Sequence, residues 1–158
     1  MLVKFSNIED KIITVRNQKV IIDSNVAELY GVETKRINEA VKNNPEKFPF
    51  GYIFELTKDE KQDVVENFDH LEKLKFAKSL PKAFTEKGLY MLATILKSEK
   101  ATQTTIAIIE TFIKIRELSR TVAELSEIKD ENEQKSLMQK SGEIISDIFW
   151  RRHENNRY

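Results

Sequence analysis

One segment of twenty residues, Asp23–Lys42, constrains the fold more than any other part of the sequence. Two helices that cross closely need a small residue in the first helix, a turn residue that tolerates positive φ, and apolar residues at fixed positions. Ala27 stands at the crossing position and Gly31 at the turn. The apolar positions are filled, in the same register, by Val26, Tyr30, Val32, Ile37 and Ala40. The pattern predicts a helix-turn-helix unit.

The outer face of the second predicted helix carries polar residues, and the N-terminal turns of such a helix can enter the major groove of DNA. Asn38 is the candidate for an adenine edge and Lys35 for a guanine edge. Thr34 suits a thymine methyl group or a phosphate, Arg36 suits a phosphate, and Lys42 completes the set. The alternative is an exposed helix face that binds no nucleic acid.

Charge is distributed unevenly along a chain whose 26 basic and 26 acidic residues cancel. Residues 1–72 carry 10 basic and 14 acidic side chains, whereas residues 73–120 carry 10 basic and 4 acidic ones. Phosphate contacts supply most non-specific affinity for DNA, so the lysine-rich segment 73–87 is the candidate phosphate-binding region. Its candidate residues are Lys73, Lys75, Lys78 and Lys82. A solvated loop is the alternative for this segment.

The remaining patterns favour an α+β fold that is predominantly helical. Two β-branched runs in residues 12–22 predict a hairpin, and Asp23-Ser24 offer N-cap oxygens to the next helix. A short strand is expected at about 52–56. Thr57–Glu60 fits a capping box that opens a helix to about residue 67.

The second half of the chain predicts long helices. Residues 74–78 could form a strand, with a loop at Pro81. Thr85 is expected to cap a helix that runs through Leu96, and a longer helix follows over about 101–125. A charged break at 127–135 precedes a last helix at about 136–152.

Apolar residues on the long helix approximate the spacing of a coiled coil, at positions 108, 112, 115, 118, 122 and 125. Burying each against a partner contributes roughly 1.5–3 kcal/mol, so the C-terminal helices are expected to form a homodimer. Two-fold pairing would place DNA half-sites about 34–36 Å apart. Alternatively, the last helix folds back and covers this face within one chain.

Ordered blocks of sequence resemble the KilA-N-like N-terminal domain of phage antirepressors, the open-reading-frame-six N-terminal family. They are Val15–Asp23, Ala27–Lys42, Lys47–Pro49, Phe54–Thr57, Leu80–Gly88, Met91-Leu92 and Ser98-Glu99, followed by the helix to about Arg116. The resemblance implies a DNA-binding domain over residues 10–118, followed by a helical tail over 119–158. The family's Gly-Gly-Arg-Arg-Tyr-like strand is replaced here by Glu72–Ser79.

The residue types of the chain argue against a catalytic or metal-binding site. The chain has no cysteine and two histidines far apart, and no nucleophile has a base beside it, so no enzyme activity, metal, cofactor or small-molecule substrate is expected. No membrane span or signal-peptide core is apparent, and a cytoplasmic location is expected. The predicted function is sequence-specific binding of double-stranded DNA by a phage-type antirepressor or transcription regulator. The alternative is a protein-interaction module whose tail binds a regulator, which the net negative charge of residues 1–72 favours.

Overall fold

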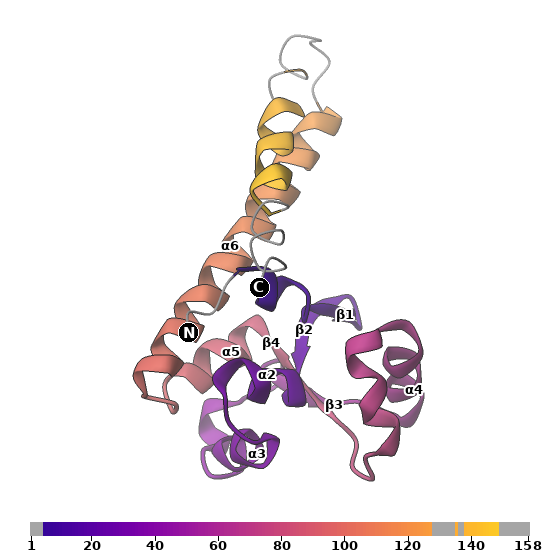
Figure 1. Cartoon of the computed structure of the whole chain (residues 1–158), viewed down its shortest axis with the longest axis vertical. Coiled ribbons are helices and arrows are strands. Elements are labelled where there is room, and N and C mark those ends of the chain that lie inside the picture. Colours follow the sequence, from indigo (N-terminus) through magenta and orange to yellow (C-terminus); the bar gives the residue numbers. More distant parts are fainter. Residues whose placement is uncertain (1–4, 128–134, 136–137, 149–158) are drawn as a thin grey trace, which may run out of the picture. The chain divides into compact units, whose positions relative to one another are not determined.

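A computed structural model describes residues 5–127, 135 and 138–148. It divides into two compact units, residues 10–105 and the described residues on either side of them. The functional boundary expected at residue 118 stays a prediction. The α+β class is confirmed, with helices predominating over one small sheet (Figure 1).

The sheet of unit 10–105 has four antiparallel strands in the order β1-β2-β4-β3 among the described residues. Strands β1 (Ile13–Val15) and β2 (Gln18–Ile22) form the predicted hairpin. Its turn residues Arg16 and Asn17 both have positive φ, 54° and 61°, as a two-residue type I′ turn requires. The predicted strand at 52–56 is also confirmed, as β3 (Ile53–Glu55).

The strand considered for residues 74–78 is wrong. Residues Asp69–Phe76 form a 3-10 helix, η2, and the strand lies later, as β4 (Lys82–Thr85). Because β4 pairs with both β2 and β3, it is a central strand of the sheet. Buried Pro81 directly precedes it, at a position where a proline interrupts no ladder hydrogen bond.

Helices cover both faces of this sheet (Figure 1). One face carries Val20 and Ile22, which pack with Leu56, Val64 and Leu71 beside α4 (Lys58–Asn67) and η2. Residues of the opposite face, such as Ile21 and Phe84, are fully buried on the side of α2 (Asp23–Tyr30) and α5 (Glu86–Ala93). This two-sided burial fixes the pairing register of the strands.

The helix-capping residues predicted from the sequence are confirmed for α4 and α5 but not for α2. Thr57 and Glu60 form the predicted capping box of α4, and Thr85 caps α5 through the N–H of Gly88. Asp23-Ser24 do not cap α2: its N-cap is Ile22, and the Asp23 carboxylate accepts a hydrogen bond from the Ser24 N–H instead. Helix α5 ends at Ala93, earlier than expected.

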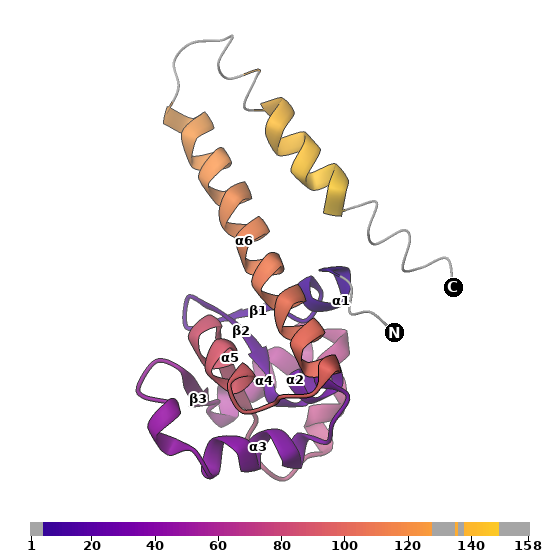
Figure 2. The ribbon, with the colours of Figure 1, turned by 90° about the vertical axis from the view of Figure 1, so that its left-hand side faces the viewer.

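A short connection links the second helix of the pair, α3 (Thr34–Lys42), to β3. The connection consists of the 3-10 turn η1 (Pro45–Lys47) and a loop that leads into the strand (Figure 2). Before the hairpin, α1 (Phe5–Glu9) opens the described chain. Tight turns hold the connection between α3 and β3, with the Lys47 N–H donating to the carbonyl oxygen of Asn44 and the Tyr52 N–H to that of Pro49.

The last elements are the long helix α6 (Glu99–Glu127) and a helix over residues 138–148. A break was expected at 127–135, but α6 includes Glu127 and residue 135 is helical; residues 128–134 and the ends of the predicted last helix lie outside the described residues. Lys114 Nζ lies 2.6 Å from Asp147 Oδ2, so the last helix contacts α6 within one chain. This agrees with the alternative in which the last helix folds back.

The face predicted for dimerisation is buried at its start but exposed further along, at Val122, and the dimer itself stays a prediction. Ile108 and Phe112 are 1% and 3% exposed within the single chain, so they are not available to a partner. The exposed isoleucines of α6 are Ile106, Ile109 and Ile113, which lie on a different side of the helix.

Candidate nucleic-acid interface

The turn between α2 and α3 has the geometry that the sequence requires of it. Gly31 adopts the left-handed conformation, with φ 69° and ψ 33°. The N–H of Val32 donates to the carbonyl oxygen of Ala27 at 3.0 Å, and the N–H of Gly31 donates to that of Glu28 at 3.2 Å. These two bonds form a Schellman motif, which ends α2 and lets the chain turn sharply into α3.

A lysine from the start of α6 lies against this turn. A Cβ atom added at Gly31 would collide with Lys100 Nζ, so the ammonium group sits directly over the glycine. The last carbonyl groups of α2 make this a favourable place for a cation. Sequence reasoning missed Lys100, because nothing in the local pattern shows that residue 100 returns to residue 31.

Helix α2 is the buried member of the pair. Val26, Ala27 and Tyr30 are at most 3% exposed, as the pattern predicted. The Tyr30 hydroxyl lies 2.8 Å from Thr105 Oγ1, and burial raises the pKa of this phenol. Val32 was expected to join this core but is 37% exposed, since it follows the turn and precedes α3.

Helix α3 is the exposed member. It buries only Ile37 and Ala40, and these two residues attach it to the core along a narrow stripe. Lys35, Arg36 and Lys42 are exposed, and Thr34 is half-buried at the first position of the helix. The outer face also carries Glu39, whose Oε1 lies 3.9 Å from Lys35 Nζ. An exposed pair at that distance contributes little and leaves Lys35 able to change partners.

Asn38 does not face outward as expected. Its Nδ2 donates to Asp23 Oδ2 at 3.2 Å, and its Oδ1 is buried without a hydrogen-bond partner among the described residues. The side chain is half-buried. The correction follows from the start of α2: because Asp23 does not cap that helix, its carboxylate is left to accept the Asn38 amide.

The Asp23 carboxylate joins α2, α3 and β4. The group is 6% exposed, and burial raises its pKa. Hydrogen bonds from Asn38 and from the backbone N–H groups of Lys82 and Ser24 act in the opposite direction, as does the positive charge of Lys82. Of the basic segment, Lys82 is thus placed next to the helix pair. The contact also fixes α3 relative to the central strand of the sheet.

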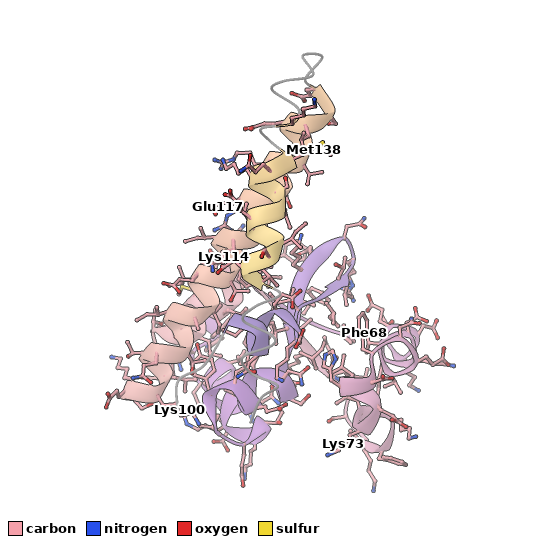
Figure 3. The ribbon with its side chains drawn as sticks, turned by 45° about the horizontal axis from the view of Figure 1, so that its top comes forward. Phe68, Lys73, Lys100, Lys114, Glu117 and Met138 are labelled. Atoms are coloured by element: carbon pink, nitrogen blue, oxygen red, sulfur yellow. The ribbon has the colours of Figure 1, made fainter. Side chains whose placement is uncertain are left out.

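The other lysines of the segment lie around η2, which packs beside α4. Lys73 lies on the outer surface of this element, and Lys78 is also exposed (Figure 3). Lys75 Nζ lies 3.1 Å from Glu72 Oε1 and 4.9 Å from the centre of the Phe76 ring. Within the described residues, no hydrogen bond or ion pair joins Lys73, Lys75 or Lys78 to α3.

The described part of the chain contains neither a candidate metal cluster nor a helix that could span a membrane. Among those residues, no group of three His, Cys, Asp or Glu side chains could hold a metal ion. No helix within the described ranges is both long and apolar enough to cross a membrane.

The fold and this surface define a small α+β domain in which a four-stranded antiparallel sheet supports a pair of helices joined by a glycine turn. The model of the ORF6N domain matches residues 10–95, which is more than half of the chain. The chain therefore belongs to the ORF6N family, a phage-associated regulatory family. Comparisons with curated proteins and with solved structures found no match.

Proposed function

We propose that α2, the Gly31 turn and α3 form a helix-turn-helix that binds double-stranded DNA. The observation that supports this most strongly is the contrast between the two helices. Helix α2 is almost wholly buried, whereas α3 buries only Ile37 and Ala40, is tied to Asp23 through the half-buried Asn38, and exposes most of its outer face to solvent. A recognition helix needs this arrangement, because its outer face must enter the major groove without displacing the core.

Base contact is assigned to Lys35, with Thr34 beside it at the start of α3. A lysine can donate to the O6 and N7 atoms of guanine, and a threonine can contact a thymine methyl group. Asn38 is given a different role: it holds α3 in place through Asp23, since its amide nitrogen already donates to that carboxylate.

Phosphate contact is assigned to cations around the helix pair. Arg36 and Lys42 flank the outer face of α3, Lys82 lies beside Asp23, and Lys100 lies at the turn. Lys73, Lys75 and Lys78 extend the set along η2. These residues come from α3, β4, α6, η2 and the loop after η2, so basic side chains from several segments would offset the acidic excess of residues 1–72.

The expected biological role is that of a phage-type antirepressor or transcription regulator that acts in the cytoplasm. It involves no enzymatic step. Membership of the ORF6N family supports a regulatory role of this kind.

The test is the salt dependence of binding to a mixed-sequence duplex, followed by fluorescence anisotropy of the full chain. Arg36→Ala should lower the slope of log affinity against log salt concentration by about one, because one phosphate contact is lost. Lys19→Ala is the matched control, since Lys19 is an exposed lysine of β2 in the hairpin and should leave the slope unchanged. Absence of wild-type binding at about 50 mM salt would contradict the proposal.

A homodimer through the C-terminal helices is also proposed, now through a different face of α6. Ile106, Ile109 and Ile113 are 51%, 38% and 42% exposed and recur at helical spacing on one side. Sedimentation of the intact chain should give twice the monomer mass of 18.5 kDa, and Ile109→Glu should give a monomer. A wild-type monomer at micromolar concentration would rule the homodimer out. It would favour the alternative, in which these isoleucines bind a different protein.

A further inference from the structure

Phe50 stands out because its side chain is 105% exposed at the tip of a tight turn. The N–H of Tyr52 donates to the carbonyl oxygen of Pro49 at 3.1 Å, and Gly51 has a φ of 93°. A proline-led turn with glycine at positive φ in its third position is a type II β-turn. Phe50 occupies the second position, so the backbone holds it in a defined direction away from the protein.

The base of this turn is anchored to the central strand. The hydroxyl of Thr85 lies 2.8 Å from the carbonyl oxygen of Gly51 and 3.0 Å from that of Tyr52. The Thr85 N–H also donates to the Tyr52 carbonyl oxygen, at 3.2 Å. The residue two before the tip, Phe48, packs edge-on against Phe84, with ring centroids 6.3 Å apart. A turn held in this way loses little conformational entropy when its tip meets a ligand.

The turn lies at the end of α3. A series of tight turns connects the end of the helix, at Lys42, to the tip eight residues later (Figure 2). Lys47 lies in this connection, with its Nζ 2.8 Å from Thr94 Oγ1, and Lys87 Nζ lies 5.7 Å from the centre of the Tyr52 ring. The acidic residue of the connection is Glu46. An aromatic tip with lysines at its base suits a polyanion that also offers flat apolar surfaces.

We propose that Phe50 is an aromatic wedge that packs against a base step in the minor groove adjoining the major-groove segment occupied by α3. The inference rests on the proposed function. Proteins that enter the minor groove insert apolar side chains between base steps, which partly unstacks the bases. Lys47 and Lys87 would contact the phosphates on either side of the tip. Phe50 lies outside the buried core of the domain.

The chain offers a matched control in Phe76, the other strongly exposed phenylalanine of unit 10–105, at 80%. Its ring lies 4.9 Å from Lys75 Nζ at the end of η2, and it is not on a turn that follows α3. Because both side chains are exposed, Phe50→Ala and Phe76→Ala should each leave the melting temperature of the full chain unchanged.

The experiment uses a duplex selected by the wild-type chain from a random pool, with 2-aminopurine placed at successive steps. Wild type and Phe76→Ala should raise the 2-aminopurine fluorescence at one step, because the probe is unstacked there. Phe50→Ala should abolish this rise and weaken binding roughly tenfold, as expected for one lost stacking contact. The salt slope should stay unchanged, since no charge is removed.

The outcomes separate the two proposals. If wild type binds but Phe50→Ala binds equally well, or no step shows a fluorescence rise, the wedge is wrong and the helix-turn-helix proposal stands. Equal losses of affinity in Phe50→Ala and Phe76→Ala would also overturn the wedge proposal, because any exposed apolar side chain would then account for the effect. If wild type binds no duplex, both proposals fail.

Discussion

Replacement of Gly31 by alanine tests the turn on which the helix pair depends. At φ 69° an L-amino acid with a Cβ atom is strained by about 1–2 kcal/mol. The added Cβ would also collide with Lys100 Nζ, but this atom ends a flexible, exposed side chain that can move aside. We therefore expect Gly31→Ala to lower the free energy of unfolding by about 1–2 kcal/mol, almost all of it from the backbone.

Thermal unfolding followed by circular dichroism measures this loss. For a chain of this size, 1 kcal/mol corresponds to a shift of about 2–4 °C in melting temperature. Gly31→Asn should lose less than Gly31→Ala, because asparagine tolerates the left-handed region better than most residues. A double-mutant cycle with Lys100→Ala should give a coupling energy below about 0.5 kcal/mol. An alanine variant as stable as wild type, or a coupling as large as the whole loss, would refute this reasoning.

Three other substitutions have clear expected outcomes. Gly88→Ala should cost more than Gly31→Ala in the same thermal assay, because its Cβ would collide with a backbone carbonyl group that cannot move aside. Asn38→Ala should lower the free energy of unfolding in urea by about 1–3 kcal/mol, since the buried Asp23 carboxylate loses a donor, and should leave base preference unaltered. The pKa of Glu60 is lowered to about 2, chiefly by its hydrogen bond from the Arg16 guanidinium group. The contribution of Glu60 is therefore present above its ordinary pKa of 4.5 and lost as pH falls from there toward 2. In Glu60→Gln, the free energy of unfolding should therefore depend less on pH between about 2 and 4.5 than it does in the wild-type chain.

Sequence patterns were sufficient where a structure depends on neighbouring residues. The hairpin, the capping box of Thr57 and Glu60, and the glycine turn each arise within a few residues of chain. Their residue types satisfy a local hydrogen bond or a local φ, and both requirements can be inferred without the tertiary structure.

Sequence patterns failed where the structure depends on distant partners. Strand β4 has four residues and follows a proline, so its own sequence gives a weak signal, yet it is one of the two central strands because β2 and β3 both pair with it. The position of Lys100 over Gly31 and the bond between Asn38 and Asp23 likewise join residues that are far apart or in different helices. Helical periodicity could not distinguish a buried side of α6 from a side that meets a partner.

Selection of bound sequences from a random duplex pool tests the central claim most directly. The claim predicts an enriched motif for the wild-type chain and loss of preference at one or two positions for Lys35→Ala, while Lys19→Ala selects the same motif as wild type. Enrichment of no motif, or the same motif for all three proteins, would contradict the assignment of α3 as the helix that contacts bases.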